Sequence, residues 1–367
     1  MDAITVQILR NKVASLVEEM HYHFYRSGYS TIIRESRDFS CVILDREGRL
    51  IVAPPMFFHA PVYRHLVGRI RKAYGGSTDA IKNGDVFVSN HPYEGGLPHV
   101  SDMAFVAPVF AAGEIVAFSG SIAHKADVGG AVAGSTSADA TEMFQEGLLV
   151  PPIKIVDAGI AQTDVERIIL SNSRQPALMR GDIQAQIAVT QMGAQRIKAL
   201  CERFGVHTVT DAFAAILKGA ADELRAAIAK LPEGESSAEG LLDSDGVVID
   251  KPVKLAVTVA IKDGIASFDF SASDAQARGP VNLRPSMVEA CVFYSLIGCL
   301  GPNLHFNDGM REVVRLKFAP RTVTNAEAPA PVSNYQMVNL KLVDVILEAL
   351  GRLHPPAPSP MPALRAR

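Results

Sequence analysis

Residues 102–124, DMAFVAPVFAAGEIVAFSGSIAH, contain two apolar runs rich in valine, isoleucine and phenylalanine, with Ala112-Gly113 between them. Such runs are typical of β-strands, and a short break that contains glycine is typical of a tight hairpin turn. The run GDVFVSN at residues 84–90 has the same character and predicts a third strand. These runs predict a β-sheet, in which the stretch NHPYEGGLPHVSDMAF at residues 90–105 leads from one strand to the next.

Helical periodicity precedes and follows this sheet. Apolar residues recur with helical spacing in residues 4–26, in residues 61–74 and from Thr163 to Lys230. The run DFSCVILDREGRLIVA, residues 38–53, instead predicts a hairpin that turns at Asp45 to Gly48. The N-terminal part of the chain is therefore expected to mix helices and strands.

A second, strand-rich region is predicted nearer the C-terminus. LPEGESSAEG, residues 231–240, interrupts the helical pattern, and KLAVTVAIKDGIASFDFSAS, residues 254–273, alternates like a hairpin that turns at Asp263-Gly264. Helices and strands segregate along the chain, so the predicted fold class is α+β. Its expected parts are a mixed α/β region at residues 1–235, a strand-rich region with a final helix at residues 236–350, and a disordered tail rich in proline and alanine at residues 351–367.

Composition and charge exclude several classes of protein. The 36 basic and 39 acidic residues nearly cancel and form no basic block, which argues against a nucleic-acid partner. No apolar run approaches the length of about 20 residues that spans a membrane, and the N-terminus lacks the pattern of a signal peptide. The expected location is the cytoplasm, without membrane contact. The four cysteines would then be reduced, buried thiols: Cys41, Cys201, Cys291 and Cys299.

Potential metal ligands gather at the ends of the predicted strands. They are His91, His99, Asp102, His124 and Asp127. Neutral imidazole nitrogens combined with carboxylate oxygens suit a divalent transition metal such as Zn, Mn or Fe. The pairs Gly95-Gly96 and Gly129-Gly130 would let the backbone approach an ion or a substrate closely. Polar loops, glycine turns and a core histidine would explain the same residues without a metal, because a histidine three residues before an aspartate is a common spacing.

Two charged segments offer further candidates. Glu142 and Glu146 are four residues apart and would share one face of a helix, where they either belong to a site or form a solvated surface. Arg34 and Arg37 precede a predicted strand, and their guanidinium groups match carboxylates and phosphates. The two arginines fit equally well into an ordinary junction that is ion-paired with neighbouring acids.

Several long motifs follow one another along the chain. They are RDFSCVILDREGRLIV (residues 37–52), GDVFVSNHPYEGGLPHVSDMAFVAPVF (84–110), IAHKADVGG (122–130), ATEMFQEGLLVPPIKI (140–155) and RGDIQAQIA (180–188). In this order they resemble the hydantoinase B family, whose members are also called B-type oxoprolinase subunits. The family includes the B-type component of ATP-dependent N-methylhydantoinase, one half of 5-oxoprolinase, and a component of acetone and acetophenone carboxylases. The resemblance extends to about Leu350.

The resemblance implies which residues hold a metal. Family members imply that His99, Asp102 and His124 are ligands. His91 stands where the common family motif NDPY has aspartate, so a further imidazole is expected at the site, and Zn is favoured over Mn. Asp127 is expected either as a ligand or as the partner that orients an imidazole.

The resemblance also implies a reaction shared with an A-type subunit of actin-like ATPase fold. That subunit phosphorylates the substrate, a small cyclic amide or a ketone, and the B-type subunit completes the reaction. Phosphorylating a lactam oxygen gives an activated imidate that water can attack, and Asp127 or Glu142 would act as the general base. This chain has no phosphate-binding loop of the form GxxxxGK[ST], so ATP is expected to bind the partner and not this chain.

Three functions remain as alternatives. The first is the B-type subunit of an ATP-dependent cyclic-amide hydrolase, which is preferred because ring opening is the family's commonest chemistry. The second is the matching subunit of an ATP-dependent ketone carboxylase. The third is a truncated, non-catalytic remnant, because family members usually continue well beyond the point that matches NLKLVDVILEALG. Truncation would expose apolar surface around Phe293, Leu296, Val343 and Ile346.

Overall fold

The computed structural model describes residues 2–54, 57–76, 80–301 and 304–353. Its first sheet has six antiparallel strands in the order β1-β4-β3-β2-β5-β6. These strands are β1 Phe39–Asp45, β2 Val86–Ser89, β3 Asp102–Ala111, β4 Glu114–His124, β5 Ile153–Asp157 and β6 Ile160–Ala161. The predicted hairpin of β3 and β4 thus lies at the centre of the sheet.

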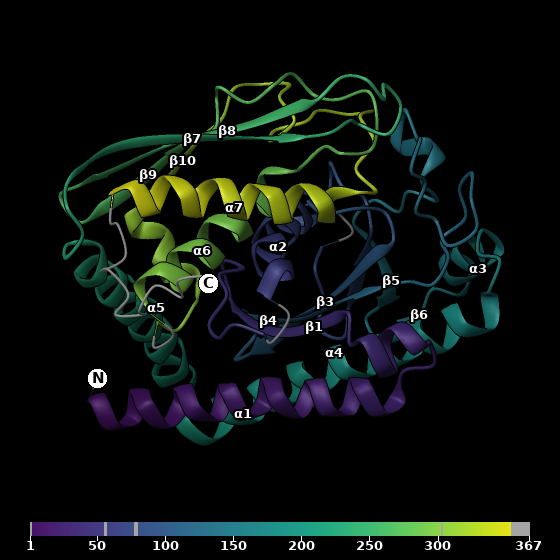
Figure 1. Cartoon of the computed structure of the whole chain (residues 1–367). Coiled ribbons are helices and arrows are strands. Elements are labelled where there is room, and N and C mark those ends of the chain that lie inside the picture. Colours follow the sequence, from purple (N-terminus) through teal and green to yellow (C-terminus); the bar gives the residue numbers. More distant parts are fainter. Residues whose placement is uncertain (1, 55–56, 77–79, 302–303, 354–367) are drawn as a thin grey trace, which may run out of the picture.

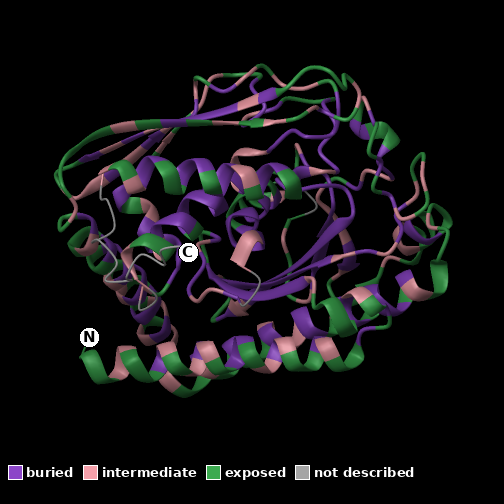
Figure 2. Ribbon diagram, viewed as in Figure 1, coloured by how far each residue is buried: buried purple, intermediate pink, exposed green. Residues whose placement is uncertain are grey.

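Helices cover both faces of this sheet. They are α1 Ala3–Ser27, α2 Ala60–Tyr74, α3 Thr163–Ser171, α4 Pro176–Phe204 and α5 Val206–Ile228. Helix α4 packs on β3 and β4, α1 packs on α4 and on β1, and α2 packs on the opposite face (Figure 1). Because both faces are covered, every residue of β1 is buried, as the purple strands of Figure 2 show.

A second sheet of four strands lies above the first. Its strands are β7 Gly234–Leu242, β8 Val253–Lys262, β9 Ile265–Asp269 and β10 Val314–Lys317, in the order β10-β9-β8-β7, with β10 parallel to β9. Helices α6 Pro285–Leu300 and α7 Tyr335–Leu353 lie between the two sheets (Figure 1). The short helical segments are η1 Ile32–Ser36, η2 Phe57–His59, η3 Met143–Gln145 and η4 Asp308–Val313. The mixture of helices with two separate sheets confirms the predicted α+β class.

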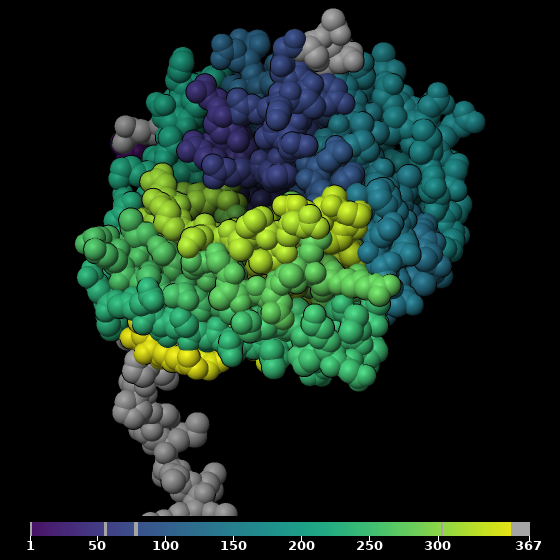
Figure 3. Space-filling view, turned by 90° about the horizontal axis from the view of Figure 1, so that it is seen from above, coloured from purple at the N-terminus to yellow at the C-terminus, as the bar shows by residue number. Residues whose placement is uncertain are grey.

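The two predicted regions share one hydrophobic core. Val42 and Phe118 of the first sheet belong to the same buried cluster as Leu255 and Ile346 of the second region. In Figure 3 the yellow-green residues of the C-terminal part lie directly against the purple and blue residues of the N-terminal part. The second sheet begins at Gly234, so the expected boundary between residues 235 and 236 falls inside β7.

Two predicted hairpin turns are confirmed. Ala112 and Gly113 have φ values of 51° and 84°, and Asp263 and Gly264 have φ values of 51° and 70°. Two successive residues with positive φ form the kind of turn whose twist matches that of antiparallel strands. The predicted first helix is also confirmed, since α1 begins at Ala3 and ends at Ser27.

The hairpin predicted at residues 38–53 forms its turn, but its second arm is shorter than predicted. The Asp45 carboxylate closes the turn by accepting the backbone N–H groups of Glu47 and Arg49. The returning arm pairs with β1 through one bridge, Leu44 to Leu50, and backbone hydrogen bonds from Asp45 to Arg49 and from Ile51 to Ile43. On its other side the backbone N–H of Leu50 donates to the Asp308 carboxylate at 2.7 Å, while β1 pairs along its whole length with β4.

The predicted exposed apolar patch is also wrong. Phe293, Leu296 and Ile346 are at most 1% exposed and Val343 is 9% exposed, because α6 and α7 pack on each other, α7 packs on β7 and β8, and α6 packs on α2. Within the described ranges, no helix combines the length and the apolarity needed to cross a membrane.

The cysteines and the C-terminal tail agree only in part with the predictions. Cys41, Cys201 and Cys291 are buried free thiols as predicted, but Cys299 is exposed near the end of α6. Of the tail predicted at residues 351–367, the first three residues continue α7, and the others lie outside the described residues.

Replacing Gly309 with alanine should show how tightly η4 packs against α5. A Cβ there would lie 1.8 Å from the Leu217 carbonyl oxygen, a backbone atom that cannot turn aside. We expect the free energy of unfolding to fall by about 1 to 3 kcal/mol, the usual cost of overpacking, in a denaturant titration. Gly298→Ala on α6 is the control, because its Cβ meets nothing within 4 Å and helix propensity favours alanine by at most about 1 kcal/mol. Equal losses in both variants would contradict this packing.

Candidate metal centre

Three side chains converge where the central hairpin ends. Asp102 is the first residue of β3, His124 is the last residue of β4, and the strand register pairs them directly. His99 lies three residues before β3 on the connecting loop. Its Nε2 is 3.1 Å from Nδ1 of His124 and 3.2 Å from Oδ1 of Asp102. Nδ1 of His124 is 3.3 Å from the same Oδ1 of Asp102. We call these three residues the triangle.

The triangle fits a divalent transition metal. Nitrogen and oxygen ligands bind such an ion at about 2.0 to 2.2 Å, which in tetrahedral or octahedral geometry separates adjacent ligand atoms by about 3 to 3.6 Å. All three measured sides fall in that range. Asp102 is 1% exposed, and its carboxylate oxygens lie 3.2 to 3.5 Å from imidazole nitrogens without a well-aligned hydrogen bond to a described residue. A buried carboxylate without a well-aligned donor is costly, and a metal ion would satisfy it.

Electrostatics keep the central carboxylate ionised. Burial alone would raise the pKa of Asp102, but the facing imidazoles of His99, His124 and His59 hold it well below its usual range. Burial also works against the charged form of His99, yet the Asp102 carboxylate outweighs this effect and raises the pKa of His99. A metal ligand must be deprotonated to bind, so a carboxylate of low pKa suits the role.

Two neighbours of the triangle were not found from the sequence. Nε2 of His59, at the end of η2, lies 3.5 Å from Oδ2 of Asp102. Asp38, just before β1, has its Oδ2 3.9 Å from Nδ1 of His124 and its Oδ1 3.9 Å from Nε2 of His59. Burial and the neighbouring Asp102 raise the pKa of Asp38. Asp38 stands in the charged segment noted above, but only the pairing of β1 with β4 places it beside His124.

Residues from the C-terminal region complete the surroundings. Nδ1 of His99 lies 3.2 Å from the carbonyl oxygen of Ser333. A carbonyl only accepts, so Nδ1 carries the proton and Nε2 directs its lone pair into the triangle. Tyr335, the first residue of α7, packs edge-on against the His99 ring at 4.9 Å between centroids.

Glu146 holds the segment that orients His99. It is fully buried, and its Oε1 accepts the backbone N–H groups of Val332 and Ser333, both at 2.6 Å. Its Oε2 has no hydrogen-bond partner among the described residues, and burial raises the pKa of this carboxyl to about 7. Hydrogen-bonded partners of metal ligands usually set the orientation of the ligand ring. The motif ATEMFQEG drew attention to Glu146, but its contacts are with residues almost 190 positions away in the sequence.

His91 does not belong to the triangle. Its Nδ1 accepts the backbone N–H groups of Tyr93 and Glu94, so the imidazole closes the turn that follows β2. The preference for Zn over Mn depended on His91 as an additional ligand and therefore has no basis in this cluster. Gly95 and Gly96 are packing positions, because a Cβ would meet Ser89 at 2.6 Å or His65 at 2.7 Å.

Asp127 organises a loop instead of contacting an imidazole. Its carboxylate accepts the N–H groups of Gly129 and Gly134, each at 3.0 Å, and both the backbone N–H and the guanidinium of Arg174. Gly129 and Gly130 have positive φ and pack closely against the neighbouring backbone. None of these hydrogen bonds involves His99, Asp102 or His124.

The structure leaves Glu142, Arg34 and Arg37 at the surface. Glu142 is exposed and caps η3. Arg34 lines a surface cavity beside the C-terminal end of α1, and Arg37 stacks on the ring of Tyr25 at 4.8 Å. None of the three is brought to the triangle.

Comparisons with known proteins identify the same family that the sequence motifs resemble. The family model described as Hydantoinase B/oxoprolinase matches residues 2–363. The B-type component of a putative D-/L-hydantoinase from Pseudomonas sp. (strain NS671) is 32% identical over 97% of this chain and 62% of its own length. The 5-oxoprolinase of Saccharomyces cerevisiae is 27% identical over 96% of this chain and 28% of its own length.

Solved structures share the fold. The ATP-dependent caprolactamase from Pseudomonas jessenii superposes with a TM-score of 0.87 and 26% identity, covering 97% of this chain and 61% of the other. A nucleotide-free acetone carboxylase gives a TM-score of 0.85 at 16% identity, covering 96% of this chain and 48% of the other, which shows a common fold alone. The chain spans about three fifths of the length of the hydantoinase relative and of the caprolactamase chain.

Proposed function

The chain belongs to the hydantoinase B/oxoprolinase family, and from this premise we propose that it is the B-type component of an ATP-dependent hydrolase of cyclic amides. The observation that carries the proposal is the triangle of His99, Asp102 and His124, whose buried carboxylate lacks a well-aligned hydrogen bond to a described residue. Two histidines and one carboxylate leave coordination positions open, which distinguishes catalytic metal sites from closed structural ones. The metal would be Zn, Mn or Fe.

A metal bound there lowers the pKa of a bound water and polarises a carbonyl or phosphoryl oxygen. The protein's own residues hold and orient the site. Ser333 fixes the tautomer of His99, and Tyr335 packs against the same ring and limits the access of bulk water. Asp38 lies at the partly open side of the triangle, beside His124. It is the carboxylate best placed to accept a proton from an attacking water.

The ATP-dependent step belongs to a partner. A lactam is a stable amide, and transfer of a phosphoryl group to its carbonyl oxygen makes the ring carbon electrophilic. Water then adds to that carbon, the ring C–N bond breaks as the nitrogen takes up a proton, and an acyl phosphate is left. A second water hydrolyses this acyl phosphate to a carboxylate and phosphate. We propose that an A-type subunit of actin-like ATPase fold supplies the phosphorylated substrate, since this chain has no GxxxxGK[ST] loop. The expected setting is the cytoplasm.

Reconstitution with the A-type subunit tests this function. The purified pair should hydrolyse hydantoin or 5-oxoproline with one ATP consumed per ring opened, and the chain alone should turn over neither ATP nor an unactivated lactam. Ring opening is followed by chromatography and ATP consumption by ADP release. Bicarbonate-dependent consumption of acetone without ring opening would establish the carboxylase instead. A chain that binds no metal and adds nothing to the A-type subunit would be a non-catalytic remnant.

A further inference from the structure

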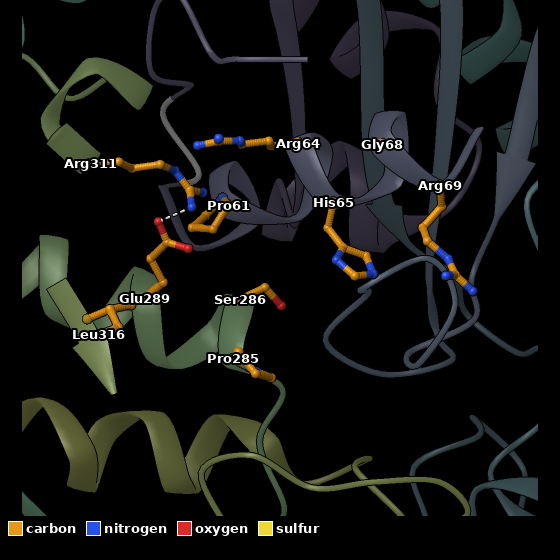
Figure 4. A pocket seen from close by; sticks show the side chains of 10 residues that line it. All are labelled: Pro61, Arg64, His65, Gly68, Arg69, Pro285, Ser286, Glu289, Arg311 and Leu316. Carbon is orange, nitrogen blue, oxygen red and sulfur yellow. Dashed lines mark ion pairs between the residues drawn. The ribbon is translucent and has the colours of Figure 1, made fainter. Parts of the chain in front are cut away.

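A second polar cavity lies beside the loop that carries His99 but outside the triangle. It has a volume of about 410 Å³ and lies between α2, the start of α6 and η4 (Figure 4). Its lining includes Arg64, His65, Arg69, Ser286, Glu289 and Arg311. Ser286 donates to the carbonyl oxygen of Gly96 at 3.0 Å, which ties the cavity wall to the loop between β2 and β3.

The cavity carries an excess of positive charge. Arg311 pairs with Glu289, and its Nε donates to Asp308 at 2.7 Å. Arg64 and Arg69 are exposed on α2 and form no ion pair with a described residue. The lining therefore carries three guanidinium groups and a single carboxylate, since Asp308 is used by Arg311 and by the backbone of Leu50.

One of these guanidinium groups is incompletely satisfied. Nη2 of Arg311 is buried and has no hydrogen-bond partner among the described residues. In Figure 4 the side chains of Arg64 and Arg311 extend toward one another from opposite walls of the cavity. Arg64 also acts electrostatically on Glu289, the partner of Arg311, which agrees with this closeness. A buried donor without an acceptor is costly, and an anionic ligand between the two arginines would satisfy it.

The arrangement favours a tetrahedral oxyanion over a carboxylate. A planar carboxylate is matched by one guanidinium fork, whereas donors that approach from opposite walls need oxygens that point in several directions. We propose that this cavity binds a phosphate group between Arg64 and Arg311, either as inorganic phosphate or as part of a phosphate ester. Glu289 limits the affinity, because its carboxylate competes for Arg311. The proposal does not depend on a metal in the triangle.

Calorimetric titration of the full chain with inorganic phosphate tests the site. We expect saturable binding that Arg64→Gln weakens by about tenfold or more, the effect of losing charged hydrogen bonds. Glu289→Gln should tighten binding, since it removes the competing charge. Lys72→Gln is the matched control, because Lys72 is an exposed cation on the same helix that does not line the cavity, and it should change the affinity by less than about threefold.

Three results would overturn the proposal. The first is the absence of saturable phosphate binding. The second is an equal loss in Arg64→Gln and Lys72→Gln, which would reveal general attraction to a basic surface. The third is acetate binding as tight as phosphate binding, which would make the cavity a carboxylate site. Sulfate is a second tetrahedral probe and should compete with phosphate, and circular dichroism confirms that each variant remains folded.

Discussion

Replacement of Asp102 by asparagine should abolish stoichiometric metal binding. Loss of a residue that only supports a metal ligand weakens metal binding by about 10- to 100-fold. Asp102 is itself a ligand in the proposed site, so its loss should weaken metal binding by more than about 100-fold. The amide oxygen carries no charge, and its NH₂ group would compete for the imidazoles of His99 and His124. Metal content after dialysis and competition with a chelator measure the effect, and ATP-dependent ring opening with the A-type subunit should be lost in parallel.

The histidine variants provide matched comparisons. His99→Asn and His124→Asn should lose metal as Asp102→Asn does, while His207→Asn, an exposed histidine on α5, should retain it. His91→Asn should also retain metal, because His91 closes a turn and is not part of the triangle. Full metal occupancy in Asp102→Asn, or loss of metal in His91→Asn alone, would place the metal elsewhere in the protein.

Glu146→Ala is expected to weaken both the fold and the metal site. The substitution leaves the backbone N–H groups of Val332 and Ser333 without an acceptor, and each buried unpaired donor costs about 1 to 3 kcal/mol. We therefore expect the free energy of unfolding to fall by about 2 to 6 kcal/mol in a denaturant titration. Metal affinity should fall by about 10- to 100-fold, because the Ser333 carbonyl would no longer hold His99 in place.

Two further variants separate positioning from general destabilisation. Glu146→Gln keeps an acceptor oxygen for the two N–H groups and should restore most of the metal affinity. Glu142→Ala removes an exposed carboxylate from the same segment and should leave metal affinity unchanged. If Glu146→Ala unfolds more easily yet binds metal as tightly as the unmodified protein, the segment that contains Ser333 does not orient His99.

Local signals explain which parts of the fold were predictable. The turns at Ala112-Gly113 and Asp263-Gly264 depend on a few adjacent residues that accept positive φ, so composition reveals them. The short second arm of the hairpin predicted at residues 38–53 was not foreseen, because a distant residue, Asp308, binds the backbone N–H of Leu50 on the side away from β1. The apolar runs in α6 and α7 showed that these helices need covering, but not that β7 and β8 cover α7 and that α2 covers α6.

The candidate site, too, was predictable from the sequence only in part. The residues offered five candidate ligands at the ends of the predicted strands, and the family resemblance named His99, Asp102 and His124 among them. Local register then pairs Asp102 with His124. His91 was misplaced because an imidazole that ligates a metal and one that closes a turn look alike in a sequence. Asp38 and His59 were missed as neighbours of Asp102, since strand pairing and helix packing, not spacing along the chain, place them there.

The sequence by itself determined the central hairpin, the helical segments and the three residues of the triangle, because turn chemistry, periodicity and short motifs act over a few residues. Only the tertiary structure decided what surrounds the triangle. Ser333 and Tyr335 meet His99, and Glu146 meets Ser333, because α6 and α7 lie between the two sheets and bring residues 332–335 onto the first one. The physical reason is that burial and hydrogen-bond satisfaction are properties of the whole packed chain, and no local pattern records which distant backbone group a buried carboxylate will meet.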